Sequence, residues 1–238
     1  MKKLSIIIPA YNEEKTIKEI LAKVKNLLIP EIEKEIIVVD DASTDKTGLI
    51  LKEQKGIKFI LHQKNLGKGG AFKTGLKQAQ GEIIIVQDAD LEYDPEDIKK
   101  CLEPILKGEA KVVYGSRELD KKNRTRSGWL FFIGGKTVTW FCNLLYGSHL
   151  TDEPTCYKCF KTEIIKSFDI ENNDFAWEPE ITAKILKQGF KIKEVPIKYF
   201  PRKQGKKINY QDGIKALITL LKYKFIAPKK IKNKINNI

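Results

Sequence analysis

Several features that assign a chain to a common protein class are scarce in this sequence. Its 238 residues include only four cysteines, which show no regular spacing, and no signal-peptide pattern opens the chain. Both observations favour a reducing cytoplasm. The pair in "CYKC" (156–159) has no second cysteine pair and no nearby set of histidines. The spacing therefore argues against a zinc or redox site.

Long apolar runs and two nucleotide-binding fingerprints are also missing. The longest apolar stretch, "GWLFFIGG" (128–135), is far short of the roughly 20 residues that a spanning helix needs. No G-x-G-x-x-G follows the first predicted strand, which argues against a nicotinamide or flavin enzyme. The segment "NLGKGGAFKTG" (65–75) does not have the Walker spacing, so it gives no support to ATP hydrolysis.

Acidic residues are almost absent from the end of the chain. From Lys198 to Ile238 there are twelve Lys or Arg and the single acid Asp212, so this stretch carries +11 of the net +13. Such a basic segment points to phosphates, nucleic acid or an anionic membrane surface. Its apolar residues fall at helical spacing and are not interleaved as stacking aromatics, which argues against nucleic acid as the partner.

The first 120 residues alternate between strand-like and helical patterns. The strand-like runs are "LSIII" (4–8), "EIIVV" (35–39), "IKFIL" (57–61), "IIIV" (83–86) and "KVVY" (111–114). Runs that are apolar throughout belong to a sheet covered on both sides. The alternation therefore predicts an α/β fold with a Rossmann-like, mostly parallel sheet and helices on both faces.

The second half of the chain continues this unit. The segment 127–147 is aromatic-rich, 191–200 alternates and contains a proline as an edge strand does, and 213–225 is amphipathic. In the last of these, one face holds Ile214, Leu217, Ile218, Leu221 and Phe225. We predict one domain over 1–225, which ends in C-terminal amphipathic helices and is followed by a basic tail (226–238).

Carboxylates cluster after the fourth strand, where ligands of such sheets bind. Asp88-Ala89-Asp90 can hold one hard divalent cation, Mg²⁺ or Mn²⁺, already bound to a diphosphate. The acids of the following "DPEDIKK" (94–100) instead suit the first turn of a helix, with proline at its first position. The sequence therefore predicts a metal-assisted site at Asp88 and Asp90.

Five blocks in the first half resemble family-2 glycosyltransferases with the GT-A fold. They are "SIIIPAYNEEKTI", "VVDDASTDKT", "NLGKGGAFKTGL", "QDADLEYDPEDI" and "YGSR". The later "TDEPTCYK", "FAWEPEITAKILKQGFKIKEVPIKY" and "RKQGKKINYQDGIKAL" are similar to the branch of dolichol- and polyprenol-phosphate mannose or glucose synthases. The resemblance extends from residue 4 to about 223 and implies a donor such as GDP-mannose or UDP-glucose. It also implies that the domain has a nucleotide-sugar-binding part (1–120) and an acceptor-binding part (121–225).

The resemblance implies roles on the donor side. Residues expected to contact the nucleotide sugar are Pro9, Tyr11, Glu13, Asp40, Lys68, Asp88, Arg202, Lys206 and Lys207. Asp40, at the end of the second strand, would bind the base or the ribose. Asp88 would lie over the ribose and the sugar, and Asp90 would ligate the metal. Glu92, at a position where relatives often carry glutamine, could be a further ligand.

The resemblance also implies an acceptor side that recognises a lipid phosphate. Guanidinium groups match phosphate oxygens, and the candidates are Arg117, Arg124 and Arg126, with Asp152 positioning the acceptor. A phosphate monoester is already anionic near neutral pH, so direct inverting displacement needs no strong base. Arg202 would stabilise the departing nucleotide.

Two further expectations complete this interpretation. The protein would lie peripherally on the inner, cytoplasmic face of the cell membrane, attached to its anionic surface. The alternative is transfer to a saccharide hydroxyl in cell-wall or capsule synthesis, which would require a general base such as Asp152, Glu178 or Glu180.

Overall fold

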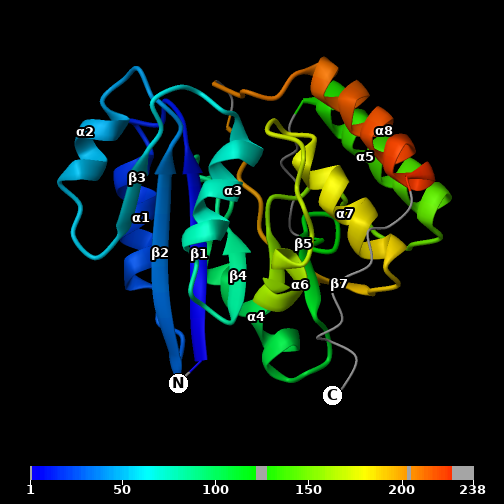
Figure 1. Ribbon diagram of the computed structural model, residues 1–238, viewed down its shortest axis with the longest axis horizontal. Helices are drawn as coiled ribbons and strands as arrows, with labels where there is room; N and C mark the ends of the chain where they lie inside the picture. Colours follow the sequence, from blue (N-terminus) through cyan, green and yellow to red (C-terminus); the bar gives the residue numbers. More distant parts are fainter. Residues whose placement is uncertain (1, 122–127, 203–204, 227–238) are drawn as a thin grey trace.

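The computed structural model describes residues 2–121, 128–202 and 205–226. Strands and helices alternate through the first half of the chain, as predicted (Figure 1). The elements are β1 (Lys2–Ala10), α1 (Ile17–Asn26), β2 (Ile32–Asp40), α2 (Thr47–Lys52), β3 (Lys58–Leu61), α3 (Lys68–Gln78), β4 (Ile83–Val86), the 3-10 helix η1 (Pro95–Asp97), α4 (Ile98–Leu106) and β5 (Val112–Ser116). The predicted strands are all present, and β1 and β2 are longer than their apolar runs.

The second half adds α5 (Trp129–Tyr146), β6 (Lys158–Lys161), α6 (Thr162–Lys166), α7 (Trp177–Lys187), β7 (Ile192–Pro196) and α8 (Tyr210–Phe225). The predicted edge strand corresponds to β7, which ends at its proline and lies at the edge of the sheet. The short strand β6 is not predicted by the sequence. It begins with the fully buried Lys158, and an interior lysine hides the apolar pattern that marks a buried strand.

One sheet of seven strands runs through the molecule in the order β3-β2-β1-β4-β6-β5-β7. Four of its six pairings are parallel, and β6 runs antiparallel to both neighbours, β4 and β5. This confirms the mostly parallel α/β fold. Because both neighbours oppose β6, they run in the same direction as each other. The carboxyl ends of β1, β2, β4 and β5 therefore meet at one edge of the sheet.

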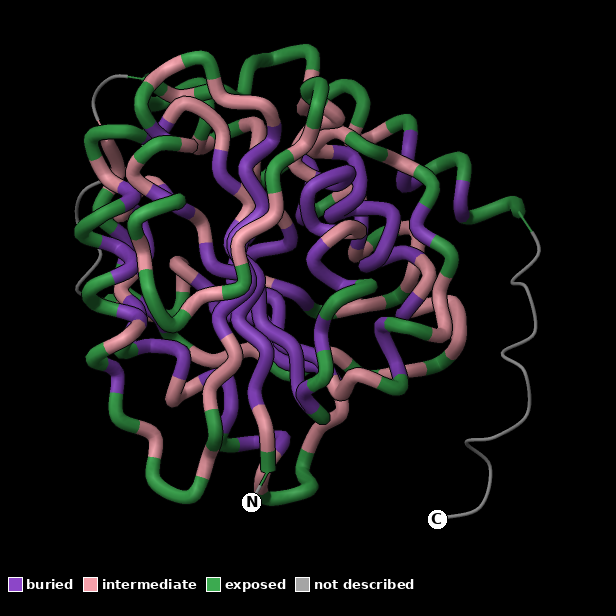
Figure 2. The backbone as a smooth tube through the Cα atoms, turned by 60° about the vertical axis from the view of Figure 1, so that its left-hand side comes forward, coloured by how far each residue is buried: buried purple, intermediate pink, exposed green. Residues whose placement is uncertain are grey.

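The core is centred on β1, whose consecutive Ile6, Ile7 and Ile8 are all fully buried. Since successive side chains point to opposite faces, this strand is covered on both sides (Figure 2). On one side α3 approaches closely at Gly75, where an added Cβ would lie 2.5 Å from Ile7 Cγ2. Glycine at this position allows the helix to rest directly on the sheet.

A smaller core joins α5, α7 and α8 beside the sheet. Its buried members are Val138, Cys142, Leu150, Ala183, Leu220 and Tyr223. Figure 1 shows α5 and α8 lying side by side along the outer edge of the molecule. Of the predicted apolar face of α8, Leu217 packs against this smaller core, whereas Ile214, Ile218, Leu221 and Phe225 are exposed. Within the described ranges, no helix is both long and apolar enough to cross a membrane.

The sheet takes strands from both predicted parts of the domain, since β6 and β7 come from beyond residue 120. The assignment of 1–120 to the donor and 121–225 to the acceptor stays a prediction. The basic tail, 226–238, lies outside the described residues except for its first position.

Candidate active site

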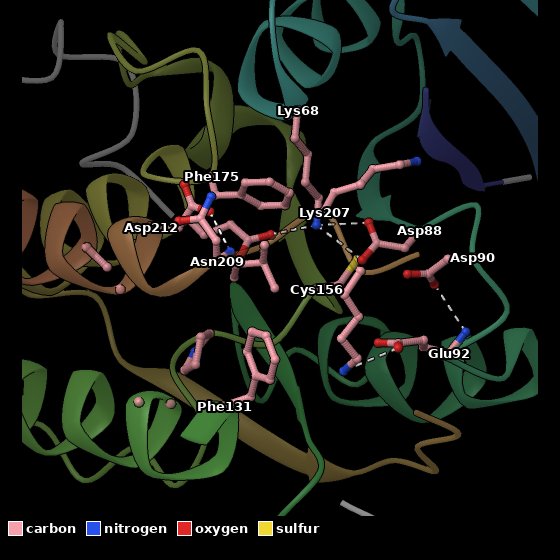
Figure 3. A pocket seen from close by; sticks show the side chains of 18 of the residues that line it. Lys68, Asp88, Asp90, Glu92, Phe131, Cys156, Phe175, Lys207, Asn209 and Asp212 are labelled. Carbon is pink, nitrogen blue, oxygen red and sulfur yellow. Dashed lines mark hydrogen bonds and ion pairs between the residues drawn. The ribbon is translucent and has the colours of Figure 1, made fainter. Parts of the chain in front are cut away.

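A cavity of about 600 Å³ opens at the edge where the parallel strands end. Residues that follow β1, β4 and β5 form one side of it, and α5 and α8 form the other. Figure 3 shows charged side chains entering this cavity from several directions. Phe131 of α5 and Phe175 lie across from each other in the same view. Most of the predicted site residues line this one cavity: Pro9, Tyr11, Glu13, Lys68, Asp88, Asp90, Glu92, Arg117, Arg202, Lys206 and Lys207.

Asp88 lies just beyond β4 and is neutralised by Lys68, the first residue of α3. Lys68 Nζ is 2.9 Å from Asp88 Oδ1 and 2.9 Å from Glu178 Oε1 at the start of α7. One lysine therefore connects three elements of the site. The Asp88 and Glu178 charges raise the pKa of Lys68 well above its ordinary value, despite the opposing effect of burial. The lysine is therefore held in its charged form.

The carboxyl group of Asp90 has a raised pKa. Burial, followed by the charges of Asp88 and Glu92, raises its pKa to about 7. The guanidinium of Arg202 opposes this rise: its Nη2 lies 3.5 Å from Asp90 Oδ2, and its Nη1 lies 3.1 Å from Glu13 Oε1. Crowded carboxylates are thus offset by cations from distant parts of the chain.

Glu92 faces a different set of partners. It accepts hydrogen bonds from the Tyr199 hydroxyl at 3.1 Å and the Arg202 backbone N–H at 2.8 Å, and Lys206 Nζ is 3.5 Å away. In the described part of the chain, no three His, Cys, Asp or Glu side chains are grouped closely enough to hold a metal ion. The geometry therefore ties Glu92 to the segment after β7, and its role as a third metal ligand stays a prediction.

Asp88 and Asp90 nevertheless fit a hard divalent cation. Their carboxylate oxygens are the ligands that Mg²⁺ and Mn²⁺ prefer, and a ligand diphosphate can complete the coordination. The raised pKa of Asp90 comes partly from repulsion by Asp88 and Glu92. A cation between the two aspartates would remove that repulsion, as Lys68 and Arg202 partly do without ligand.

Arg117, which lines the cavity, forms a second ion pair with Asp152, which is buried behind it and does not line the cavity. Arg117 Nε and Nη2 donate to the two oxygens of Asp152 at 2.7 and 2.6 Å, and its backbone N–H donates at 2.9 Å. These bonds and the guanidinium charge lower the pKa of Asp152, although burial opposes this. Glu194 accepts hydrogen bonds from the backbone N–H of Asp152 and of Thr151, which fixes this loop. Asp152 thus holds Arg117 against the cavity wall.

The acceptor arginines are only partly placed. Arg117 lines the cavity over the ring of Tyr199, at 5.2 Å from its centroid, but much of its donor capacity is directed at Asp152. Arg124 and Arg126 lie outside the described residues. Recognition of the acceptor by all three arginines stays a prediction.

The donor side brings together the residues after β1 and the segment after β7. Lys207 bonds to the Tyr11 carbonyl and lies 2.5 Å from Glu13 Oε1. Asp40, in contrast, does not line the cavity. It is fully buried, and its Oδ1 accepts from the Ser43 N–H, while Oδ2 has no hydrogen-bond partner in the described structure. Its contact with a base or ribose stays a prediction.

The family model for glycosyl transferase family 2 matches residues 5–167. The chain belongs to glycosyl transferase family 2. It is therefore a glycosyltransferase, and the cavity at the ends of β1, β4 and β5 is its candidate active site.

Two relatives and one solved structure show the range of the likeness. A UDP-N-acetylglucosamine–dolichyl-phosphate N-acetylglucosaminyltransferase of Methanococcus voltae is 31% identical, over 94% of this chain and 96% of its own length. A dolichyl-phosphate β-glucosyltransferase of Trichomonas vaginalis is 32% identical, over 92% and 72%. Glucosyl-3-phosphoglycerate synthase of Mycobacterium tuberculosis, crystallised with Mn²⁺, UDP and glucosyl-3-phosphoglycerate, superposes with a TM-score of 0.74 at 19% identity, over 95% of this chain and 81% of that chain. The last likeness supports the GT-A fold.

The structure adds site residues of this family-2 enzyme that the sequence patterns do not single out. Phe175 and Tyr199 both line the cavity beside cations, Lys68 and Arg117 respectively. The signal available was weak, because the two aromatics are the first and last residues of the family-like block 175–199 but neither carries a motif of its own. The two glutamates of "WEPE" also separate: Glu178 enters the cavity, whereas Glu180 binds the backbone of 171–172.

Proposed function

We propose that this glycosyltransferase moves a hexose from a nucleotide sugar to a polyprenyl or dolichyl phosphate. The observation that carries the proposal is the joined ionic network of one cavity, in which Asp88 and Asp90 lie opposite Lys68 and Arg202. A diphosphate and a divalent cation have the charges needed to replace these internal partners. The named relatives support the acceptor, since both act on dolichyl phosphate.

On the donor side, the residues that would hold the nucleotide sugar are Pro9, Tyr11, Glu13, Asp40, Lys68, Asp88, Arg202, Lys206 and Lys207. Asp88, Asp90 and Glu92 would hold Mg²⁺ or Mn²⁺. When bound, that ion supplies charge neutralisation for the nucleoside diphosphate. Lys68 and Arg202, once their carboxylates have another partner, are free to turn to the phosphate oxygens and stabilise the leaving group.

On the acceptor side, we propose direct inverting displacement without a general base. The second ionisation of a phosphate monoester lies near pH 6, so its oxygen is already a nucleophile at neutral pH. What the protein must provide is alignment and positive charge. Arg117 is held by Asp152 at the cavity wall, and Arg124 and Arg126 belong to the chain just before α5.

The competing acceptor, a saccharide hydroxyl, would need a base in the cavity. Glu178 is the candidate among the two glutamates of α7, but its Oε1 is paired with Lys68 at 2.9 Å. Asp152, the other candidate, is engaged by Arg117 and has a lowered pKa, which weakens it as a base. Both observations favour the phosphate acceptor.

The donor sugar and the place of action are also proposals. We propose GDP-mannose or UDP-glucose as donor. One relative is named for a UDP-sugar donor, so the donor screen includes UDP-sugars. We further propose that the enzyme lies peripherally on the anionic cytoplasmic face of the membrane. The exposed apolar faces of α5 and α8 and the net +11 of residues 198–238 support this.

The test is a donor screen in the presence of a polyprenyl phosphate, with and without divalent cations. We expect transfer from one nucleotide sugar, loss of transfer in chelator and recovery with Mg²⁺ or Mn²⁺. Asp90→Ala should fold normally and lose at least about a hundredfold in kcat. Asp94→Ala is the matched control, because Asp94 accepts from the Glu96 N–H beside η1. Full activity of Asp90→Ala in chelator would refute the metal assignment.

A further inference from the structure

The glycine-rich start of α3 packs tightly against the loop that precedes α7. A Cβ added at Gly67 would lie 2.5 Å from the carbonyl oxygen of Asn173. One added at Gly69 would lie 2.7 Å from the carbonyl oxygen of Asn172. The backbone N–H of Gly70 donates to the Asn173 carbonyl at 2.9 Å. The glycines therefore allow the backbone of this loop to rest directly on the first turn of the helix.

The same loop, residues 171–175, is held from its other side by Glu180. This glutamate is fully buried in α7, and its carboxylate accepts from the backbone N–H of Glu171 at 2.7 Å. It also accepts from the backbone N–H and the side-chain amide of Asn172, at 2.8 and 2.7 Å. Lys184, one turn further along α7, pairs with the carboxylate. Charge-assisted bonds from a buried group to two successive backbone N–H groups fix the path of the loop.

The side chain that this packing positions is Lys68. It is the first residue of α3 and lies between the two glycines that contact the loop. Its Nζ lies 5.6 Å from the ring centroid of Phe175, the last residue of the loop. The same Nζ pairs with Asp88 and Glu178, each at 2.9 Å. Because Glu178 and Glu180 belong to one helix, α7 contacts Lys68 directly and also fixes the loop on which the start of α3 rests.

We infer that Glu180 is a positioning residue of the transfer reaction, which acts on Lys68 through the loop 171–175. This inference rests on the proposed function, in which Lys68 stabilises the departing nucleoside diphosphate. Glu180 does not line the cavity, and both of its carboxylate oxygens are bonded inside the protein, so it does not contact the reacting atoms. Its contribution is alignment, and a misplacement of about 1 Å can cost about a hundredfold in rate.

The test is a double-mutant cycle between Glu180 and Lys68, with the donor found in the screen and a polyprenyl phosphate. Glu180→Gln keeps the size of the side chain but places an amide where a carboxylate oxygen accepts a backbone N–H. We expect kcat to fall about tenfold, with the KM for the acceptor unchanged within about twofold. In the Lys68→Met background, the same substitution should change kcat by less than about twofold, because the lysine through which Glu180 acts is gone.

The matched control is Glu35→Gln, at the opposite end of α3. Glu35 accepts from the Gln80 N–H at 2.9 Å and from the Ser5 hydroxyl at 2.6 Å, and it does not line the cavity. Both glutamine variants lose a bond to the backbone, so both should melt below the wild type. Only Glu180→Gln should lower kcat, which separates positioning of Lys68 from a loss of stability.

A second variant loosens the same loop from the helix side. Lys73 Nζ, in α3, donates to the carbonyl oxygens of Ile170 and Glu171, each at 3.2 Å. Lys73→Met removes these bonds and leaves Glu180 and Lys68 in place. We expect kcat to fall about threefold or more with an unchanged acceptor KM. This result decides the matter if Lys68→Met does not fold, since a wild-type kcat in Lys73→Met would overturn the inference.

The outcomes distinguish this inference from the proposed function. If Glu180→Gln keeps the wild-type kcat, or lowers kcat by the same factor with Lys68 and with methionine in its place, the positioning role is wrong although lipid-phosphate transfer stands. An equal loss of kcat in Glu35→Gln would also refute it. If Lys68→Met keeps the wild-type kcat, the role of Lys68 at the leaving group fails and this inference fails with it. If the wild type transfers no sugar to a polyprenyl phosphate, the proposed function itself fails.

Discussion

At the scale of single residues, the sequence predicts charged residues of the site but not which of them form ion pairs. Asp88 and Asp90 line the cavity because the end of a buried strand fixes where they lie, and their role as metal ligands stays a prediction. Sequence patterns do not predict that Arg202 contacts Asp90 or that Lys68 joins Asp88 to Glu178. Those pairs bridge residues that are distant in sequence, and only the folded chain brings them together.

The pair formed by Arg117 and Asp152 gives a stability prediction. Asp152 is 4% exposed, and its removal leaves a largely buried guanidinium without its main partner. Asp152→Asn should therefore lower the free energy of unfolding by about 3 kcal/mol in urea titrations. The control is Glu109→Gln, which breaks a surface pair with Lys193 whose side chains are 45% and 46% exposed, and it should cost less than about 1 kcal/mol. Equal effects of the two substitutions would contradict the account.

The same pair fixes the direction of a pH effect. The folded-state pKa of Asp152 lies below its ordinary value, chiefly because of Arg117 against the opposing effect of burial. Its contribution to stability is therefore complete above the unfolded-state pKa of about 3.9 and is lost as the pH falls through the lower folded value. The difference in unfolding free energy between wild type and Asp152→Asn should shrink over that acidic range. A difference that is constant down to strongly acidic pH would show that the pair does not act electrostatically.

At the scale of elements, apolar periodicity predicts that a helix forms but not which way its apolar face points. In α8, Ile214, Ile218, Leu221 and Phe225 share a face, yet the residues that pack inward are Leu220 and Tyr223. Helices α5 and α7 cover the inner side of α8 and leave the outer apolar side exposed. The helical spacing of apolar residues cannot by itself predict which side of α8 packs inward, because both sides carry large apolar residues.

The outer faces of α5 and α8 give a prediction about membrane attachment. On α5 the exposed apolar residues Trp129, Ile133, Trp140 and Leu144 recur at helical spacing. Ile218→Asp and Phe225→Asp should each weaken co-flotation with anionic liposomes about tenfold or more, since each removes an apolar side chain from the interface. Both positions are exposed and outside the cavity, so transfer to a short prenyl phosphate in solution should be unaffected.

The matched control for attachment is Leu28→Asp, because Leu28 is 79% exposed but belongs to neither helix. It should float with liposomes like the wild type. Raising the salt concentration should weaken binding further, since surface attraction to anionic lipid is screened. Liposome binding that is unchanged in the two aspartate variants would exclude α8 as a membrane-facing element.

At the scale of the whole molecule, the sequence predicts the sheet but not its full composition. Apolar runs reveal the five strands of the first half, although β3, at one edge of the sheet, is only half-buried, and the proline of β7 marks the other edge. The sequence pattern does not predict strand β6, because this strand is four residues long and contains a buried lysine. This antiparallel strand is what places β5, and with it Arg117, next to the ends of β1 and β4.

The charge of the whole molecule is divided in a way that fits the proposed reaction. Carboxylates and cations neutralise each other inside the cavity, while the excess of basic residues lies in 198–238. The cavity is thus prepared for a diphosphate with its cation, and the basic excess suits an anionic surface. Composition alone predicts the basic excess at the end of the chain. The neutralisation of charges inside the cavity depends on the tertiary contacts.

The most direct test of the account is the choice of acceptor. With the donor found in the screen and a divalent cation present, the enzyme should be offered a polyprenyl phosphate, the corresponding polyprenol and a free saccharide, and the products identified by mass spectrometry and NMR. We expect a glycosyl phosphate linked to the lipid, with inverted anomeric configuration and a rate that falls on the acid side at about pH 6 as the acceptor phosphate gains a proton. Preferential glycosylation of the polyprenol or the saccharide hydroxyl would contradict the account.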